Sequence, residues 1–373
     1  MNTFTARSLA AATALATSLL AACSKAPQAP AEQAATPAAP AAPACNRECL
    51  TGIVNTYVAA IIAHDPSKAP LADNVAFVEN VSKMKPGEGF WQSAVKAPGT
   101  FALTVPDEST QSVGYLAMMT RIAPQSAPQG ATPEQREAAG KAPPTEQPVL
   151  VAFRLKLDAT GKIAEAEHLL AGINPTTAKE GAPPTPFDNL QSPRPGLFAE
   201  IPAEQRLPHD KLIEIGMSYY PSLDDNNGEL APYSPDCERH ENGMITASSV
   251  PAPDRPAIPG TTPQPKVARD CKGQMTSGTF QYIDRIENRR VFAADPATGL
   301  VMGLSHFRHP MNNLPYMVTA MDGSKIERNK DNLSFAPFDL PAAHIFKVGA
   351  DGLIHEIEAM GFMAPYNSAT GWE

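Results

Sequence analysis

The chain has 373 residues, of which 18% are charged and 39 are proline, and its formal net charge at pH 7 is −9. An acidic chain without a cluster of lysine and arginine is not typical of proteins that bind nucleic acid or that attach to membranes through a polybasic patch. About 329 residues remain after two N-terminal segments, which is enough for two domains of ordinary size.

Residues 1–22 have the features of a secretory signal peptide. Arg7 is their only charged residue, and the apolar run over residues 9–22 is too short for a membrane-spanning helix. The run ends in Leu-Ala-Ala-Cys, which resembles the bacterial lipobox and implies that Cys23 becomes the lipidated first residue of the mature protein. A simple signal peptide with an unrelated cysteine is the alternative. Ser24 is similar to the residue that sends lipoproteins to the outer membrane, so we expect a lipid anchor at its periplasmic face.

Residues 23–44 predict an extended tether. Beyond Ser24 they are almost all alanine, proline, glutamine and glutamate, a composition that has nothing to bury. No later stretch reaches the roughly eighteen apolar residues of a transmembrane helix. We therefore expect contact with the membrane through the lipid anchor only.

The four remaining cysteines are Cys45, Cys49, Cys237 and Cys271. An even number of cysteines in an oxidising compartment favours disulfides, with three possible connectivities. Of these we expect the two local pairs, Cys45 with Cys49 and Cys237 with Cys271. A zinc site is the alternative, but no Cys-x-x-Cys pair or suitably spaced histidine supports it.

The first copy of a repeated unit, residues 45–173, begins with helices and continues with strands. Apolar residues recur at helical spacing over residues 49–64, and Asp65-Pro66 ends this helix. Gly87 to Trp91 predicts a turn into a short helix. We expect a second short helix or a turn at residues 67–72, a long loop at residues 124–148, and strands at residues 75–79, 100–105, 112–122, 149–157 and 162–170.

The second copy, residues 208–373, follows a proline-rich connector at residues 174–207. With an offset of 162 residues, residues 50–80 and 212–242 share seven identities in 31 ungapped positions, whereas about two are expected by chance. A second offset, of 191 residues, aligns the closing strands of the two copies. We expect a helix at residues 211–223, a loop at residues 311–343, and strands at residues 237–241, 279–285, 290–293, 301–308, 343–348 and 353–360.

Helices followed by an antiparallel meander indicate an α+β fold and not alternating βαβ units. The order also resembles the SnoaL-like, nuclear transport factor 2-like superfamily, in a secreted bacterial and fungal branch of unknown function. The resemblance rests on Cys45 to Leu50, Tyr57, Asp65-Pro66, Glu79-Asn80 and Gly87 to Trp91. It implies two tandem cone-shaped domains, each with helices packed on a curved antiparallel sheet around a pocket. It also implies that the two copies meet by their sheets as an internal pseudo-dimer.

The two copies differ where a site is expected. The first copy has Val81 where the second has Gly243, and the second lacks a Gly-Phe-Trp turn. A site therefore need not exist in both copies.

Glu79 and Glu241 each end a predicted strand, and each is followed by asparagine. In an apolar setting such a carboxylate can act as a general base. The alternative is that each glutamate accepts hydrogen bonds from backbone N–H groups of the following turn, where asparagine is favoured.

Two pairs of glutamates lie two residues apart on predicted strands, so each pair shares one strand face. We interpret Glu165, Glu167, Glu356 and Glu358 as a solvated outer face, with cation binding as the alternative. His168 and His355 are then surface or packing histidines on the opposite strand faces.

His306 and His309 are the histidines most typical of a site, because they flank Arg308 ahead of a long loop. Three residues apart on a strand, they point to opposite faces, so joint metal binding requires a turn. Arg154 lies on an otherwise apolar strand and is either an ion-pair partner or a ligand contact. We take His306 as a candidate catalytic residue, and Trp91, Arg154, Arg308 and His309 as candidate ligand contacts.

The sequence contains no nucleophile elbow, phosphate loop or dinucleotide fingerprint, so no cofactor and no metal are expected. We interpret the chain as a lipid-anchored cell-envelope protein whose paired domains bind a small apolar or aromatic molecule or a partner. The alternative is a cofactor-free lyase, isomerase or hydratase that uses Glu79, Glu241 or His306 as acid and base.

Overall fold

The structure is a computed structural model that describes residues 44–125, 132–249, 270–333 and 335–373. The expected signal peptide, residues 1–22, and all but the last residue of the expected tether, residues 23–44, lie outside these ranges. The described residues belong to one compact unit, residues 41–373. Within them, no helix is both long and apolar enough to cross a membrane.

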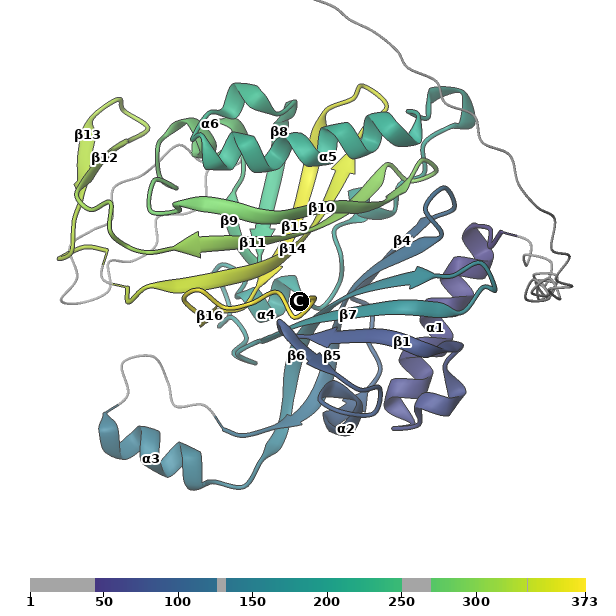
Figure 1. The fold of residues 1–373 in the computed structure, drawn as a ribbon. Helices are drawn as coiled ribbons and strands as arrows, with labels where there is room; N and C mark the ends of the chain where they lie inside the picture. The colour runs from purple at the N-terminus through teal and green to yellow at the C-terminus, as the bar shows by residue number, and fades with distance from the viewer. Residues whose placement is uncertain (1–43, 126–131, 250–269, 334) are drawn as a thin grey trace, which may run out of the picture. The chain divides into compact units, whose positions relative to one another are not determined.

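Two seven-stranded sheets with few helices make up an α+β fold (Figure 1). The first sheet has the order β2-β1-β7-β6-β5-β3, and β4 pairs with β5. Its strands are β1 (Leu71–Glu79), β2 (Ser82–Met84), β3 (Ala94–Lys96), β4 (Ala102–Asp107), β5 (Ser112–Ala123), β6 (Thr145–Leu157) and β7 (Ile163–Gly172).

The second sheet has the order β10-β11-β14-β15-β8-β9, and β16 pairs with β14. Its strands are β8 (Tyr233–Glu241), β9 (Met244–Ala247), β10 (Arg285–Asp295), β11 (Leu300–His309), β14 (Phe338–Val348), β15 (Ile354–Gly361) and β16 (Ala364–Pro365). A separate two-stranded hairpin consists of β12 (Tyr316–Thr319) and β13 (Lys325–Arg328).

One long helix accompanies each sheet: α1 (Arg47–Ile62) the first and α5 (His209–Asp224) the second. Asn46 begins α1, because its side chain accepts a hydrogen bond from the Cys49 backbone N–H at 2.9 Å. Figure 1 shows α5 lying along its sheet and α3 projecting from the first sheet. The shorter helices are α2 (Phe90–Ser93), α3 (Pro133–Lys141), α4 (Pro186–Asn189), α6 (Cys271–Thr276), η1 (Pro66–Lys68), η2 (Pro195–Phe198), η3 (Ala203–Gln205) and η4 (Gly228–Leu230).

The strand orders of the two sheets correspond. The order β2-β1-β7-β6-β5 in the first sheet matches β9-β8-β15-β14-β11 in the second. The helix α1 precedes the first set and α5 precedes the second. Three-dimensional structure and sequence repeat thus show the same internal duplication.

Three apolar cores hold the elements together. One lies between α1 and the first sheet and includes Leu50 and Tyr57, and a second lies between α5 and the second sheet and includes Leu212 and Tyr219. The third joins side chains of both sheets, among them Leu103, Leu150, Leu169, Leu300, Met302, Leu304 and Ile345. Each sheet therefore has apolar residues packed on both of its faces.

The expectation of purely antiparallel sheets is wrong. β1 pairs with β7 and β8 pairs with β15 in parallel. Hairpins force neighbouring strands to be antiparallel, but these two pairs join the first strand of each sheet to a strand much later in the chain, β7 or β15. The long intervening chain lets the later strand run in the same direction as the first.

Three local expectations also need correction. The expected loop at residues 124–148 contains α3, whose start is fixed by a capping box between Thr132 and Gln135. Residues 279–283, expected as a strand, form turns after α6, and β10 starts only at Arg285. The expected loop at residues 311–343 contains β12, β13 and the start of β14.

Candidate functional site

A pocket opens in the second half, between the end of α5, the second sheet and the turns at residues 280–283. Its cavity volume is about 40 Å³, and the empty space reaches about 380 Å³ only when the open solvent at its mouth is included. Its walls are mostly apolar or aromatic and include Leu223, Phe280, Ile283, Phe307, Leu340 and Met360.

The Cys237–Cys271 disulfide helps to form one wall of this pocket. It ties β8 to α6, and the turns that follow α6 carry Phe280 and Ile283 to the pocket. The Phe280 N–H donates a hydrogen bond to the Asn226 side chain at 3.1 Å, which attaches this wall to the end of α5.

Arg239 and Glu241 provide an ion pair in the pocket. They lie two residues apart on β8 and so share one strand face. The guanidinium of Arg239 donates to Glu241 Oε2 at 2.7 Å, to the Tyr219 hydroxyl at 3.0 Å and to Thr246 Oγ1 at 2.7 Å. Arg239 is buried. These three hydrogen bonds fix the orientation of the Arg239 guanidinium group.

Two buried histidines, His309 on β11 and His344 on β14, also line the pocket. Burial lowers the pKa of His309 to about 4 and lowers the pKa of His344 well below its ordinary value. Both imidazoles are therefore neutral at pH 7. The Nδ1 atom of each is buried and has no hydrogen-bond partner within the described part of the chain.

Aromatic rings hold His309 in place. Its ring stacks on Phe338 with centroids 4.1 Å apart and an interplanar angle of 7°, and on Tyr282 at 5.5 Å and 25°. Burial raises the pKa of Tyr282, so its phenol is also neutral at pH 7. The site thus combines flat apolar walls with a few fixed polar groups, an arrangement that suits binding and orienting a small molecule.

In the first half, buried side chains among the described residues occupy the corresponding interior. The Tyr57 hydroxyl hydrogen bonds to His168 Nε2 at 2.9 Å, and His168 Nδ1 lies 3.1 Å from Glu79 Oε2. Phe90 and Trp91, from the Gly-Phe-Trp turn, pack against this group, and the rings of Trp91 and Tyr57 meet edge to face at 5.2 Å. All five side chains are buried.

Glu79 accepts hydrogen bonds from the Phe90 backbone N–H at 2.9 and 3.0 Å. A Cβ atom at position 89 would lie 2.3 Å from Glu79 Oε1, so the turn requires Gly89 there. The carboxylate of Glu79 thus fixes the turn that fills the first half.

Residues 205–361 match the family model of a domain of unknown function (DUF8021). The matched segment contains every residue that lines the pocket. A comparison with curated proteins gave no match.

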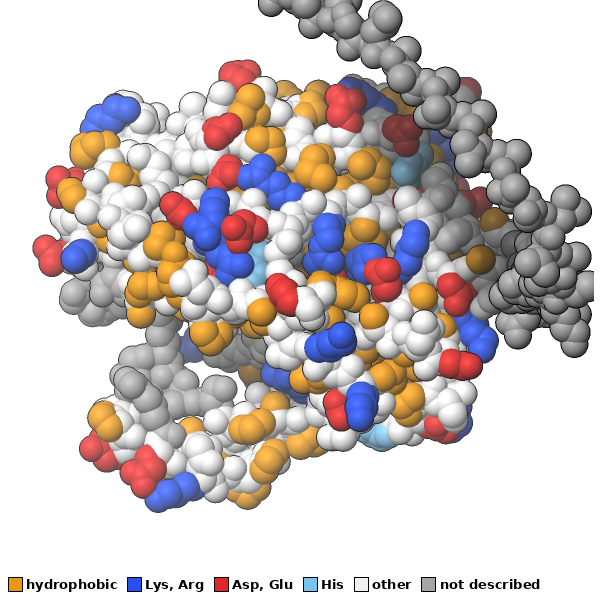
Figure 2. Space-filling model, in the orientation of Figure 1, with side chains coloured by type: hydrophobic (Ala, Val, Ile, Leu, Met, Phe, Trp, Pro, Cys, Tyr) orange, Lys and Arg blue, Asp and Glu red, His pale blue; other side chains and the backbone are white. Residues whose placement is uncertain are grey.

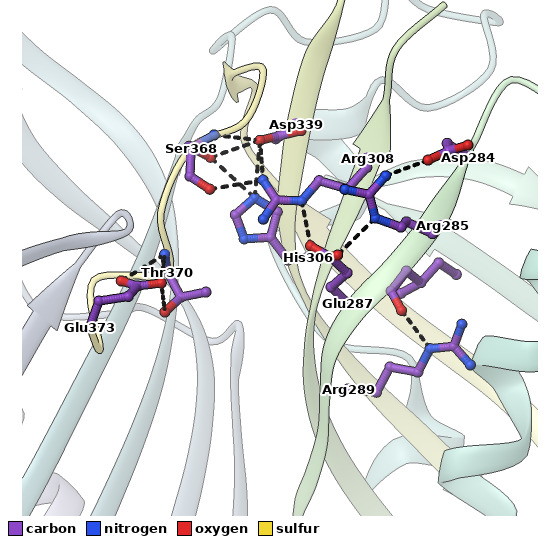
Figure 3. A network of polar contacts seen from close by, with 11 residues as sticks. Asp284, Arg285, Glu287, Arg289, His306, Arg308, Asp339, Ser368, Thr370 and Glu373 are labelled. Carbon is purple, nitrogen blue, oxygen red and sulfur yellow. Dashed lines mark hydrogen bonds and ion pairs between the residues drawn. The ribbon is translucent and has the colours of Figure 1, made fainter.

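His306 points away from the pocket of His309, as their spacing predicts. Figure 3 shows it beside Arg308, Asp339 and Ser368. His306 Nε2 lies 3.1 Å from Ser368 Oγ and 3.4 Å from Asp339 Oδ2. A catalytic triad needs the carboxylate at Nδ1 and the hydroxyl at Nε2. Because one nitrogen meets both groups here, the cluster does not have triad geometry.

Arg308 and Arg154 are ion-pair partners. Arg308 contacts Asp339 at 2.5 Å and Glu287 at 2.8 Å, and it donates to the Ser368 carbonyl (Figure 3). Arg154 contacts Glu165 at 2.6 Å and lies 5.7 Å from the ring centroids of Phe292 and Trp372. Neither arginine lines the pocket. Both help to attach the C-terminal segment.

The expectation of a solvated outer face for the paired glutamates is wrong for three of the four. Glu167 and Glu358 are buried, and Glu356 is half-buried. Arg290 forms an ion pair with Glu167. Arg194 of the connector lies 3.2 Å from Glu356 and 3.1 Å from Glu358. These strand faces are covered by the other half and by the connector. Glu165 is the more exposed member of its pair, and His168 is a packing residue of the core.

Both predicted disulfides are present, Cys45–Cys49 and Cys237–Cys271. Cys23 lies outside the described residues. Among the residues that the structure describes, no group of three or more histidine, cysteine, aspartate or glutamate side chains could hold a metal ion. On the face shown in Figure 2, acidic and basic side chains are interspersed with apolar ones.

Sequence reasoning missed Arg239, Tyr282 and His344. The offset of 162 residues aligns Arg239 with the core residue Phe77, and the offset of 191 residues aligns His344 with the core residue Phe153. Arg239 and His344 are therefore polar residues at positions where the first copy has an aromatic core residue. For these two residues, the difference between the copies is the sequence signal that could have identified them.

Proposed function

We propose that the second half binds a small apolar or aromatic molecule in the pocket between α5 and the second sheet. One observation carries this proposal: the two halves share a strand order, yet the first is filled by Phe90 and Trp91, whereas the second keeps an open pocket with polar groups at its surface. An open, mostly apolar pocket with a few fixed polar groups is the usual form of a small-molecule site.

In this proposal the two halves are SnoaL-like, nuclear transport factor 2-like cones that form an internal pseudo-dimer. The corresponding strand orders support two copies of one fold, and the apolar core shared by both sheets supports their pairing. The first copy then serves as a scaffold, because its interior is packed. The second copy holds the ligand.

Binding can be measured by titrating the full chain with naphthalene and 2-methoxynaphthalene, which are small two-ring probes. We expect saturable binding with one site per chain. Leu340→Trp places a large ring at the pocket wall and should abolish binding. Met317→Trp adds the same ring at an exposed position on β12 that does not line the pocket, and it should leave binding unchanged. Equal loss in both variants, or no binding to the wild type, would contradict the proposal.

We also propose that Cys23 anchors the protein by lipid to the cell envelope, at the periplasmic face of the outer membrane. The lipobox resemblance supports this, and lipid chains contribute roughly 0.8 kcal/mol per buried CH₂. Cys23→Ala should release the protein from washed membranes. Recovery of this variant in membranes to the wild-type extent would contradict the anchor.

A cofactor-free lyase, isomerase or hydratase is the second candidate, because Glu241 and His309 line the same pocket. A carboxylate beside a neutral imidazole can transfer a proton to and from a carbon acid. Exchange of the α-protons of 2-tetralone in D₂O, followed by NMR, tests this activity. Glu241→Gln should slow catalysed exchange by about 10² to 10⁴. The binding function stands alone if the wild type gives only the uncatalysed rate.

A further inference from the structure

Two equivalent side chains each connect one half of the molecule to the other. The offset of 162 residues that relates the two copies places His209 at the position of Arg47. Arg47 is the first residue of α1, and His209 is the first residue of α5. Arg47 lies 3.0 Å from Asp295 of the second half. His209 Nε2 lies 2.8 Å from Asp107 of the first half. The two halves thus exchange equivalent contacts.

The two aspartates occupy equivalent places as well. Asp107 ends β4 and Asp295 ends β10, and each is followed by a turn into the next strand of its sheet. Asp107 accepts a hydrogen bond from the Thr110 N–H at 2.9 Å, and Asp295 accepts one from the Ala297 N–H at 3.1 Å. Both aspartates are buried. Because a buried charge without a partner is costly, each aspartate is stabilised by the cation that the other half supplies.

Asp107 contacts the second half at two elements. Its Oδ2 atom accepts a hydrogen bond from the Ala294 N–H of β10 at 2.9 Å. The same oxygen lies 2.8 Å from the Nε2 atom of His209 at the start of α5. One carboxylate of the first half therefore joins β4 to both α5 and β10.

The surroundings of His209 require a charged imidazole. Its Nδ1 atom lies 2.9 Å from Asp210, and its Nε2 atom faces Asp107. A carboxylate only accepts hydrogen bonds and a neutral imidazole has one N–H donor, so both contacts form only when both nitrogens carry a proton. Burial lowers the pKa of His209, but the hydrogen bonds to Asp210 and Asp107 outweigh burial and raise this pKa above its usual value of 6.5.

The charged groups around His209 come from three elements. Asp107 ends β4, Asp210 lies on α5, and Lys156 of β6 donates to the Thr110 carbonyl in the turn after β4. Within the described residues, His209 is the one cation that forms an ion pair with Asp107. The dipole of α5 disfavours a cation at the start of the helix, so the two aspartates hold the second proton on His209 against it.

Arg47 keeps its charge at a pH where His209 loses it. The side-chain hydrogen bond to Asp295 raises the pKa of Arg47, and the nearby charges of Glu200 and Glu108 add to this effect. A guanidinium is in any case protonated over the whole ordinary pH range. One of the two equivalent contacts therefore responds to pH, and the other does not.

We infer that the contact between His209 and Asp107 is a pH-sensitive latch, which holds the two halves together at this point while His209 is charged. The equivalent contact of Arg47 stays closed. As the pH rises, His209 loses one proton, and the neutral ring donates to only one of its two carboxylates. Because folding raises the pKa of His209, its stabilising effect is complete below about pH 6.5 and is lost as the pH rises through the folded-state pKa. The latch acts on the contact between the halves and is independent of the pocket.

Hydrogen exchange of the Ala294 amide reports the latch, because this N–H donates to Asp107. It is followed by NMR on the full chain at pH 6 and pH 9, as protection relative to an unstructured peptide at the same pH. Wild-type protection should fall about three- to tenfold between the two values, because a charge-assisted hydrogen bond gives way to a neutral one.

Two variants at one position isolate the charge of His209. His209→Arg introduces the residue that the first copy has there, so the protection of Ala294 should stay high at both pH values. His209→Gln keeps an N–H donor without a charge, so the protection should be low at both.

His355→Gln is the matched control. The nitrogens of His355 also lie near two carboxylates, Asp236 at 2.8 Å and Asp351 at 3.2 Å, but all three residues belong to the second half. This variant should keep the wild-type pH dependence at Ala294.

The pKa of His209 is read separately from its imidazole NMR signals, which are assigned by their loss in His209→Gln. A titration midpoint above 6.5 supports the latch, and a midpoint at or below 6.5 would overturn it. Protection of Ala294 that is independent of pH in wild type, or that falls equally in His209→Gln, would also overturn the latch.

Discussion

The hydroxyl groups of Tyr57 and Tyr219 occupy equivalent places in the two halves but meet different partners. Tyr57 hydrogen bonds to His168 at 2.9 Å, and Tyr219 accepts from Arg239 at 3.0 Å. His168 comes from β7, the last strand of its half, whereas Arg239 comes from β8, the first strand of the other. The aligned position of His168 is Ala359. The second half thus replaces a bulky imidazole with a small side chain that lines the pocket.

The first prediction concerns the buried group of Tyr57, His168 and Glu79. His168→Phe should lower the free energy of unfolding by about 3 kcal/mol or more, because it removes a hydrogen bond to the buried Glu79 carboxylate, and an unsatisfied carboxylate costs more than an unsatisfied neutral group. Tyr57→Phe should cost less, about 1 to 3 kcal/mol, because it leaves only one ring nitrogen of His168 without its partner. Urea denaturation of both variants measures the difference. A larger cost for Tyr57→Phe would show that the hydroxyl, and not the imidazole, supports this core.

The second prediction concerns the two disulfides. Cys237 and Cys271 are separated by 34 residues and Cys45 and Cys49 by 4. In the chain-entropy description, the first bridge stabilises by about 4 kcal/mol and the second by about 2 kcal/mol. Paired cysteine-to-serine variants of each bridge, compared by denaturation, should show this order.

Loss of the longer bridge should also weaken binding of the naphthalene probes, because it releases the wall that carries Phe280. Loss of the Cys45–Cys49 bridge is the control and should leave binding unchanged. An equal effect of the two on binding would contradict this account of the wall.

The fold class was predictable from sequence because helices and strands differ in the period of their apolar residues. The sequence did not show which strand faces are exposed to solvent and which are covered. Spacing placed Glu356 and Glu358 on one face, and the structure agrees, but the sheet has buried residues on both faces. Alternation alone cannot tell a solvated face from one covered by a distant segment such as the connector residue Arg194.

The candidate site was predictable in part. Glu241 and His309 were both selected from the sequence, and both line the pocket. His306, and not His309, was the catalytic candidate. Period-two spacing shows that the two histidines face opposite sides of the sheet, but it does not show which of them faces inward. Arg239 and His344 required a comparison of the copies at core positions, because their own neighbours do not mark them: Arg239 stands in a charged run and His344 in an apolar one.

The third prediction is a pH dependence that arises from His309. Its pKa falls from 6.5 to about 4 on folding, so between these values the unfolded chain binds more protons. The free energy of unfolding should therefore decrease as the pH falls from 6.5 towards 4. Between pH 7 and pH 5 the contribution of His309 is about 2 kcal/mol.

Denaturation of wild type and His309→Phe at pH 7 and pH 5 measures this contribution. The variant should lose about 2 kcal/mol less than wild type on acidification. The same loss in both proteins would show that His309 titrates alike in the folded and unfolded states.

The fourth prediction concerns the contact between Glu167 of the first half and Arg290 of the second. The pair is bidentate, with distances of 2.7 and 2.8 Å, and Glu167 is buried. Such a pair keeps its geometry and is only partly screened by solvent. A double-mutant cycle with Glu167→Gln and Arg290→Met should give a coupling free energy of about 1.5 to 3 kcal/mol.

The ion pair between Glu137 and Lys141 on α3 is a suitable control, because both of its side chains are exposed. Exposed pairs four residues apart on a helix contribute about 0.3 to 0.5 kcal/mol, and salt screens them. The Glu167–Arg290 coupling should persist in 1 M NaCl, whereas the control coupling should vanish. A Glu167–Arg290 coupling no larger than the control would mean that apolar packing alone joins the halves at this point. The buried Glu167 would then contribute little to the contact.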